Sequence, residues 1–314
     1  MKKILKRYYY KYKIFFYLLY FVKKIMAFID YSKIKKLSDE EFIQYRYKKI
    51  FNREADLLNP TLFTEKIQWL KLNDRNDLYS QCADKYSVRS YVEKKVGSNY
   101  LIPLRFVTQD YKDINTLNIS DYPCIIKTTH DSGGTFILNE KNRFKLYAVR
   151  QKLKKRLTQN FYLKNREWEY KNIIPKIIVE ELIRDKNNTE QLNDYKIYCF
   201  NGTPKFIQTI FDRGDEPKED WYDTDWNLLD LHYFSPINKY VEKPKLLNKL
   251  IEVASKLSKD FNYVRVDLYI ANNQVYFGEL TFRPYGGFMK FVPESFDEEL
   301  GSYLVLNKDT LGNE

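Results

Sequence analysis

The chain has 314 residues, which is enough for one large domain or two ordinary ones with a sizeable core. Its 30% charged and 44% hydrophobic residues exclude a wholly disordered protein, and its ten Gly and ten Pro exclude a collagen-like or linker-dominated one. Because there are only two His residues, His130 and His232, a His-rich metal centre is not expected. Cys82, Cys124 and Cys199 form no CxxC motif, and we expect buried free thiols at Cys124 and Cys199, which fits a reducing compartment.

The positive charge is concentrated at the N-terminus. The whole chain has a net charge of +11, and residues 1–36 contain eleven basic residues and one acid, Asp30. A nucleic-acid binder would usually carry its basic patch on a folded face, so nucleic acid is not expected as a partner. The apolar run Ile14–Val22 is shorter than the ~20 residues that span a bilayer, but with its flanking Lys residues it suits a helix lying on an anionic membrane. We therefore expect residues 1–37 to attach a cytoplasmic protein to the inner face of the cell membrane. A signal peptide and a helix packed on protein are the alternatives.

Residues 38–100 have the spacing of helices. Ser38 provides a capping hydroxyl before three acidic residues, which is typical of a helix start. We expect three helices here, at residues 38–51, from Asn59 through Leu70, and at residues 84–96, the last stopped by Gly97. This segment is predicted to be a helical lead-in to the rest of the chain.

Strand patterns dominate from residue 101 onward. Strands are expected at residues 101–107, 123–128, 135–138, 176–183, 195–201, 204–211, 263–270 and 274–282, and helices at residues 145–160 and 244–260. The pairs Asn201-Gly202 and Asn272-Asn273 are typical of hairpin turns. Strands mixed with helices and joined by hairpins predict an α+β fold rather than regular βαβ winding.

A Lys at the end of a strand precedes a loop rich in small residues. The chain has neither a P-loop nor a Rossmann fingerprint, but Cys124–Lys127 is followed by a loop with the sequence Ser132-Gly133-Gly134. Lys supplies charge for phosphate oxygens, and paired Gly residues let backbone N–H groups approach an anion. An ordinary turn after a strand is the alternative.

Two carboxylates and a hydroxyl are expected on adjacent strands. Arg265 and Asp267 share one face of their strand, and the predicted hairpin brings Glu279 and Thr281 alongside them. A few hard oxygens of this kind are what Mg²⁺ needs when phosphates and water complete its shell. Arg265 could hold the same phosphates by a bidentate contact. A cross-strand ion pair between Arg265 and Glu279 is the alternative.

A third acidic group lies where one strand ends and the next begins. Glu180 and Glu181 close an apolar strand, and Asp194 with Lys196 opens the following one. Solvated strand ends commonly carry such acids, so these residues alone do not indicate a site.

Taken in order, these groups resemble the ATP-grasp fold, and the chain is similar to the TupA-like ATP-grasp family, which is linked to teichuronopeptide and to capsular or other surface-polysaccharide synthesis. The segments that carry the likeness are residues 63–72, 84–89, 125–127, 166–170, 194–196, 199–202, 264–269 and 277–282. The likeness covers residues 55–305. It implies a first lobe at residues 101–178 and a second lobe with the metal site at residues 179–305, between the lead-in and a tail at residues 306–314.

The resemblance implies that ATP is held between the two lobes. The implied nucleotide-binding residues are Lys85, Lys127, His130, Ser132, Gly133, Gly134, Glu180, Glu181, Leu182, Ile183, Asp194 and Lys196. Lys127 would contact the α- and β-phosphates, and the loop from His130 to Gly134 would close over them. Glu180 would accept a hydrogen bond from the adenine amino group, residues 181–183 would present backbone to the ring, and Asp194 would hold the ribose hydroxyls.

The resemblance also implies the metal and the reaction. Asp267 and Glu279 would be Mg²⁺ ligands with Thr281, which stands where many ligases of this fold have Asn, so a second metal is less assured. Arg265 would stabilise the transferred phosphoryl group, and Arg265 and Lys127 are the implied catalytic residues. ATP would activate a carboxylate as an acyl phosphate that an amine attacks. No acceptor-binding residue is implied.

The resulting hypothesis is an ATP- and Mg²⁺-dependent carboxylate–amine ligase that acts on a uronic acid or amino acid in surface-polysaccharide synthesis. Its partners would be an amine, a sugar or glycolipid-linked acceptor, and the anionic membrane. A metal-dependent glycosyltransferase is one alternative, because Asp223 and Asp225 form an Asp-x-Asp pattern, although a turn between strands explains them too. A non-catalytic assembly scaffold is the other.

Overall fold

The computed structural model describes residues 20–21, 34–116, 118–184, 192–211, 218–233, 235–236 and 242–306. The chain divides into two compact units, residues 1–54 and residues 55–314. The expected interfacial helix at 14–22 lies outside the described residues except for Tyr20 and Phe21, so the membrane association stays a prediction. None of the helices within the described ranges is both long enough and apolar enough to cross a bilayer.

Helix α2 (Asp39–Phe51) is the main described element of the first unit, and its start is the predicted one. Glu41 N–H donates to the Ser38 hydroxyl at 3.2 Å, and Ser38 N–H donates to the Glu41 carboxylate at 2.8 Å. This reciprocal capping box satisfies two backbone donors at the helix start. The helix ends at Asn52, which takes the left-handed conformation with φ 59°.

Three helices open the second unit: α3 (Phe63–Asn73), α4 (Asp77–Ala83) and α5 (Val88–Val96). The expected helix start at Asn59 is wrong, because the buried Glu65 carboxylate accepts the N–H groups of Asp56, Thr61 and Leu62 and holds that stretch as a loop. The expected helix at residues 84–96 is shorter. The Asp84 carboxylate accepts the N–H groups of Tyr86 at 2.7 Å and Ser87 at 3.0 Å, so the chain turns there before α5 begins.

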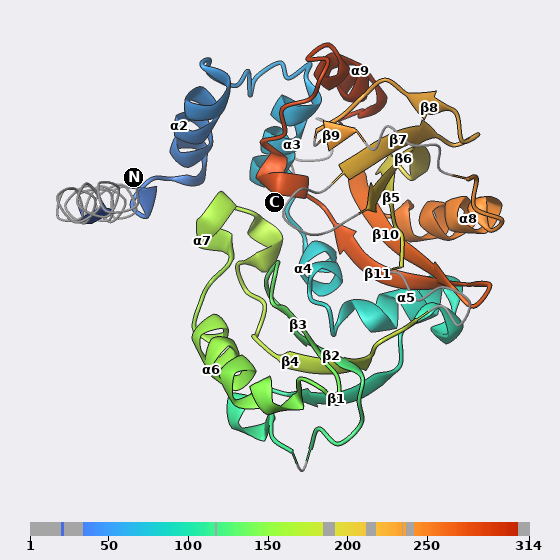
Figure 1. Cartoon of the computed structure of the whole chain (residues 1–314). Helices are drawn as coiled ribbons and strands as arrows, with labels where there is room; N and C mark the ends of the chain where they lie inside the picture. Colours follow the sequence, from blue (N-terminus) through green and yellow to red (C-terminus); the bar gives the residue numbers. More distant parts are fainter. Residues whose placement is uncertain are drawn as a thin grey trace, which may run out of the picture. The chain divides into compact units, whose positions relative to one another are not determined.

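A four-stranded antiparallel sheet has the order β1-β4-β2-β3 (Figure 1). Its strands are β1 (Leu104–Thr108), β2 (Cys124–Thr128), β3 (Thr135–Leu138) and β4 (Ile177–Glu181). Helix α6 (Leu146–Leu157) packs on this sheet through Leu146, Val149 and Leu153. The expected boundary between lobes after residue 178 falls inside β4, whose whole length pairs within this sheet.

A larger sheet has the order β11-β10-β5-β6-β7-β8, with β9 paired to β7. Its strands are β5 (Asp194–Phe200), β6 (Thr203–Phe211), β7 (Lys218–Asp223), β8 (Leu228–Leu229), β9 (Ser235–Pro236), β10 (Tyr263–Ala271) and β11 (Gln274–Thr281). Both predicted hairpins are present. Asn201, Gly202, Asn272 and Asn273 all have positive φ, as tight hairpin turns require. The α+β fold is therefore confirmed.

Each face of the larger sheet has its own core. The amphipathic helix α8 (Leu247–Ser258) packs with Val264, Val266 and Leu268 on one side. Helix α3 and helix α9 (Phe296–Tyr303) pack with aromatic residues of the sheet on the other side. All three cysteines are buried and free, as predicted for Cys124 and Cys199, and burial raises the pKa of the Cys82 thiol to about 12.

The remaining described elements are short. They are α7 (Tyr162–Asn165) and the 3₁₀ turns η1 (Ser98–Tyr100), η2 (Tyr111–Asp113), η3 (Arg143–Lys145), η4 (Trp168–Tyr170) and η5 (Pro284–Gly287). The segment that contains α7 and η4 connects α6 to β4.

Candidate functional site

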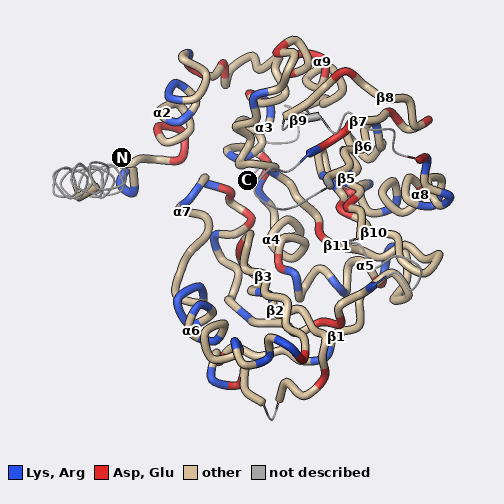
Figure 2. The backbone as a smooth tube through the Cα atoms, in the orientation of Figure 1, with Lys and Arg blue, Asp and Glu red and all other residues tan. Residues whose placement is uncertain are grey.

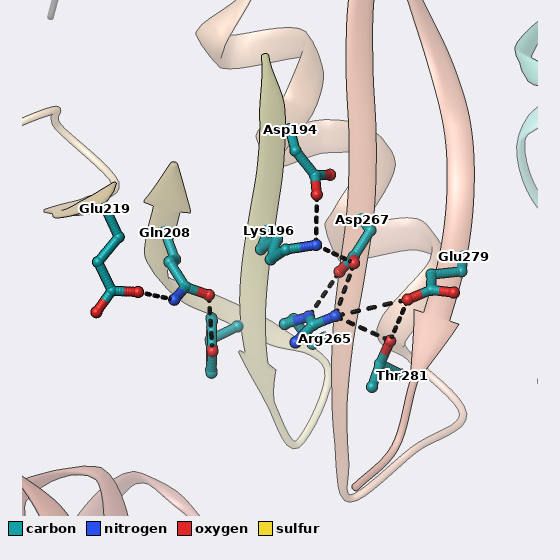
Figure 3. Close-up of polar contacts among 9 residues, drawn as sticks. Asp194, Lys196, Gln208, Glu219, Arg265, Asp267, Glu279 and Thr281 are labelled. Atoms are coloured by element: carbon teal, nitrogen blue, oxygen red, sulfur yellow. Dashed lines mark hydrogen bonds and ion pairs between the residues drawn. The ribbon is translucent and has the colours of Figure 1, made fainter. Parts of the chain in front are cut away.

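A row of polar side chains crosses the larger sheet on one face (Figure 3). In the strand register, Asp267 lies opposite Glu279 on one side and Lys196 on the other, while Arg265 lies opposite Thr281. Side chains of directly paired residues lie on the same face of a sheet. The predicted juxtaposition of Arg265, Asp267, Glu279 and Thr281 is therefore confirmed, and Lys196 joins it from β5.

Asp267 lies at the centre of this row and is held by two cations. Its Oδ1 accepts from Arg265 Nε at 2.7 Å, and its Oδ2 accepts from Arg265 Nη2 at 2.7 Å and from Lys196 Nζ at 2.6 Å. Lys196 also pairs with Asp194 at 2.5 Å. Burial opposes ionisation of Asp267, but the attraction of Arg265 and Lys196 outweighs it and lowers the pKa of this carboxyl. Asp194, expected at the ribose, thus lies in the same network.

Glu279 and Thr281 form the more open end of the row. The Glu279 side chain is 43% exposed, whereas that of Asp267 is 2% exposed. Arg265 Nη2 lies 3.6 Å from Glu279 Oε1 and donates to Thr281 Oγ1 at 3.2 Å. The Thr281 hydroxyl donates to Glu279 Oε1 at 3.1 Å. The cross-strand ion pair between Arg265 and Glu279, which was the alternative to a metal site, is present as well.

These oxygens fit a Mg²⁺ ion that also binds phosphates. Mg²⁺ commonly takes one or two carboxylates and completes its shell with water and substrate oxygens. Within the part of the chain that the structure describes, no group of three or more Asp, Glu, His or Cys side chains forms a metal site by itself. Asp267, Glu279 and Thr281 offer two carboxylates and a hydroxyl, which is the partial set that such an ion requires.

Buried side chains at the base of the loop after β2 form hydrogen bonds that hold its two ends together. The Thr128 hydroxyl donates to the Asp131 carboxylate, and Thr128 N–H donates to Gly134 O at 3.1 Å. A Cβ at Gly134 would lie 1.9 Å from the Thr128 hydroxyl oxygen, so only Gly fits there. Ser132 and Gly133 are exposed at the tip, and Gly133 has φ +79°. The tip therefore presents small residues and backbone to solvent.

Two basic residues from other elements hold this loop. Lys85 Nζ donates to Asp131 O, and Lys85 N–H donates to Thr129 O at 3.2 Å. Arg156, in the basic last turn of α6 (Figure 2), donates to the Asp131 carboxylate and to Gly133 O, the latter at 2.8 Å. His130 Nε2 lies 3.1 Å from Arg156 O. Lys85 and His130 therefore lie at the predicted loop.

Glu180 at the end of β4 is bracketed by cations. Its Oε2 pairs with Lys127 Nζ at 2.7 Å, and its Oε1 pairs with Arg89 Nη1 at 3.3 Å. Glu181 N–H donates to Pro103 O at 3.1 Å, and Leu182 and Ile183 follow half-buried. A carboxylate has about four acceptor positions, so Glu180 keeps capacity for a further donor.

Sequence reasoning missed the roles of Arg89, Asp131 and Arg156. Arg89 lies in α5 and reaches a carboxylate 91 positions later, and Arg156 lies 25 positions from Asp131. Long, flexible cations in helices give no local signal of their partners. The position of Asp131 inside the Gly-containing loop is the one sequence feature from which its role in holding the loop could have been predicted.

Asp223 and Asp225 lie in a turn between strands, which was the alternative to a glycosyltransferase motif. Asp223 Oδ1 accepts the N–H groups of Asp225 at 2.9 Å and Asn227 at 2.8 Å, and its Oδ2 accepts from Asn227 Nδ2 at 2.7 Å. Partial burial opposes ionisation of Asp223, but hydrogen bonds from Asn227 and neighbouring N–H groups outweigh it and lower its pKa. The carboxylate is thereby engaged in closing the β7–β8 connection.

Comparisons with known proteins point to one family. A sequence model described as TupA-like ATPgrasp matches residues 65–305. No curated protein sequence gives a significant match. Among solved structures, D-alanine–D-alanine ligase from Bacillus anthracis is 17% identical with a TM-score of 0.40, over 64% of this chain and 57% of that protein.

Two further solved structures have similar scores. The ATP-grasp ligase PsnB, complexed with minimal precursor, is 12% identical with a TM-score of 0.37, over 65% of this chain and 54% of that one. D-alanine–D-alanine ligase from Helicobacter pylori is 15% identical with a TM-score of 0.36, over 71% of this chain and 61% of that one. The chain thus spans less than two thirds of the length of these solved proteins.

Proposed function

The chain belongs to the TupA-like ATP-grasp family, and we propose that it is an ATP-dependent ligase that joins a carboxylate to an amine through an acyl phosphate. The observation that supports this most is the polar row of the larger sheet. It places Asp267 and Glu279 side by side and backs them with Arg265 and Lys196. Acids and cations interleaved on one face suit a triphosphate with its counter-ion.

Lys127 and the loop after it would bind the nucleotide phosphates. Lys127 ends β2, and the loop that follows presents Ser132 and Gly133 at its exposed tip. Arg156 and Lys85 hold the base of this loop, so its backbone is positioned before a ligand arrives. Glu180, Leu182 and Ile183 would meet the adenine where β4 ends.

Asp267, Glu279 and Thr281 would hold Mg²⁺, which when bound supplies positive charge against the transferred phosphoryl oxygens. Arg265 would add to this charge. Two hydrogen bonds to Asp267 fix one edge of its guanidinium, so it needs little reorganisation as charge develops. Catalysis of this type consists mainly of positioning and electrostatic stabilisation.

The substrates that we propose are a uronic acid or an amino acid as the carboxylate, and an amine on a sugar or glycolipid-linked acceptor, in the synthesis of a capsular or other surface polysaccharide. The support for this finer assignment is the resemblance of the chain to its family. A cytoplasmic protein at the inner face of the membrane would meet such acceptors, and this location is part of the proposal.

The nucleotide site is tested by Lys127→Ala. Mg-ATP at about 100 times its Kd should stabilise the wild type by about 2.7 kcal/mol, and this gain should be lost in the variant because a phosphate contact is removed. The measurement is the shift in thermal midpoint on adding Mg-ATP. Lys141→Ala, an exposed Lys of the same sheet region, is the matched control and should keep the shift. A full shift in Lys127→Ala would refute the assignment.

The membrane proposal is tested by deleting residues 1–36, which removes a net charge of +10. The full chain should co-sediment with vesicles that contain phosphatidylserine, since basic residues near an anionic surface contribute about 1 kcal/mol each, and the truncated chain should not. Vesicles of phosphatidylcholine alone are the control, and added salt should weaken the binding. Equal binding of the truncated chain would contradict the proposal.

A further inference from the structure

Residues 158–176 connect α6 to β4, yet part of this segment packs on the half of the molecule that contains the larger sheet. Lys71 Nζ of α3 donates to Asn165 O at 3.0 Å, and η4 packs against α4. A Cβ at Gly286 would lie 2.7 Å from Asn165 Cγ, so Gly lets the Asn165 side chain pack against the backbone at this position. The segment is thus held in place by elements far from it in sequence.

Two glutamates of this segment are buried. Glu167 is 5% exposed and Glu169 is 2% exposed. Asn165 Nδ2 donates to Glu167 Oε1 at 2.9 Å, but Glu169 Oε1 has no hydrogen-bond partner among the residues that the structure describes. A buried carboxylate oxygen without a donor costs free energy, which native proteins rarely tolerate without a reason.

Lys71 and Arg283 attract Glu167, but in the described part of the chain neither cation forms an ion pair with the two acids. Lys71 has three ammonium donors, and they go to Gln68 Oε1 at 2.8 Å, Asn165 O at 3.0 Å and Gly286 O at 2.5 Å. Across the described ranges, neither Glu167 nor Glu169 forms an ion pair with a Lys or Arg. The pair therefore presents negative charge that a ligand cation could satisfy.

The position of the pair is next to the proposed reaction site. Burial raises the pKa of the Tyr170 hydroxyl, and the negative charges of Glu167, Glu169, Glu279 and Asp131 raise it further. The packing gives the same position: η4 packs against α4, and α4 contacts β11, the strand that carries Glu279 and Thr281. At the other end of the segment, Thr129 N–H, at the base of the loop after β2, donates to Lys176 O at 3.0 Å.

We propose that Glu169, with Glu167 beside it, binds the ammonium group of the amine substrate. This inference rests on the proposed ligase function and adds a second-substrate site to it. The bound ammonium loses a proton to solvent and becomes a neutral amine. Its nitrogen forms a C–N bond with the acyl carbon, the C–O bond to phosphate breaks, and inorganic phosphate leaves while the nitrogen loses a second proton to solvent.

The experiment separates acyl-phosphate formation from amine capture. Full-length protein is incubated with Mg-ATP and with pools of uronic acids and amino acids. Hydroxylamine is then added. It is largely uncharged at neutral pH and traps an acyl phosphate as a hydroxamate. The same mixtures are then given ammonium chloride, ethanolamine or glucosamine, and amide and ADP are measured. Wild type, Glu169→Gln, Glu169→Asp and the exposed control Glu140→Gln are compared.

We expect the KM for the amine to rise at least about 30-fold in Glu169→Gln, as for a lost buried charge pair, with hydroxamate formation changed far less. Glu169→Asp should recover part of the loss, and Glu140→Gln should match the wild type. An unchanged amine KM in Glu169→Gln would overturn the inference. Absence of hydroxamate in the wild type with every carboxylate would instead refute the ligase function on which it rests.

Stability gives an independent readout. Because the Oε1 atom of Glu169 is buried without a donor among the described residues, replacing the carboxylate by an amide should raise the thermal midpoint of Glu169→Gln by about 2–4 °C. A carboxylate kept only for folding would behave in the opposite way. A lower midpoint for Glu169→Gln would therefore count against a ligand site.

Discussion

Asp267→Asn is expected to reduce ADP formation on the order of 10²–10³-fold and to lower the free energy of unfolding by about 3–5 kcal/mol. The activity falls because a proposed Mg²⁺ carboxylate is lost. The stability falls because Arg265 and Lys196 remain buried without the charge that both contact. Steady-state ADP release and denaturant unfolding measure the two effects.

Glu279→Gln is the matched variant. Its side chain is 43% exposed, and it lies 3.6 Å from Arg265, so the change leaves no buried cation unpaired. It should lose activity to a similar extent with little change in stability. If Asp267→Asn kept full activity, the metal assignment would fail. If Glu279→Gln were as unstable as Asp267→Asn, the account of the buried charges would fail.

Glu167→Gln is expected to remove a pH dependence of stability. Burial and the neighbouring Glu169 raise the pKa of Glu167 from 4.5 to about 7, against the attraction of Lys71. The folded state therefore holds this proton more tightly than the unfolded state does. The contribution of Glu167 to the free energy of unfolding should be greatest below about pH 4.5, fall by about 3 kcal/mol as the pH rises to about 7, and then stay level.

The variant has no group to titrate at this position, so its unfolding free energy should lack that decline and should exceed that of the wild type at pH 8. Denaturant unfolding at pH 5, 6, 7 and 8 measures this. Glu140→Gln, an exposed change, should keep the wild-type profile. Parallel profiles for Glu167→Gln and the wild type would show that the Glu167 carboxyl has an ordinary pKa.

The sequence predicted the hairpins and the polar row because the information is local. Asn272 and Asn273 tolerate positive φ, and the alternation of Arg265, Val266 and Asp267 assigns faces within one strand. A hairpin then fixes which residues lie opposite one another. Arg265, Asp267, Glu279 and Thr281 could therefore be placed relative to one another without the structure.

Contacts between distant segments could not be predicted in this way. The sequence around Asn165 contains no pattern that predicts a hydrogen bond from Lys71, 94 positions earlier, to the Asn165 carbonyl oxygen. The capping role of Glu65, which delays the start of α3, likewise depends on a loop folding back on its carboxylate. Such contacts depend on how distant segments pack together and not on the local secondary-structure propensity of the sequence.

The path of residues 158–176 has a thermodynamic consequence. The segment is covalently continuous with the sheet that carries Lys127, but Asn165 is bound by Lys71 on the other half of the molecule. The loop after β2 and Glu169 are joined through this one stretch of backbone, because Thr129 N–H also donates to Lys176 O at 3.0 Å. Binding free energies at two coupled sites are reciprocal, so in the proposed ligase whatever factor Mg-ATP contributed to the affinity for the amine, the amine would return to the affinity for Mg-ATP.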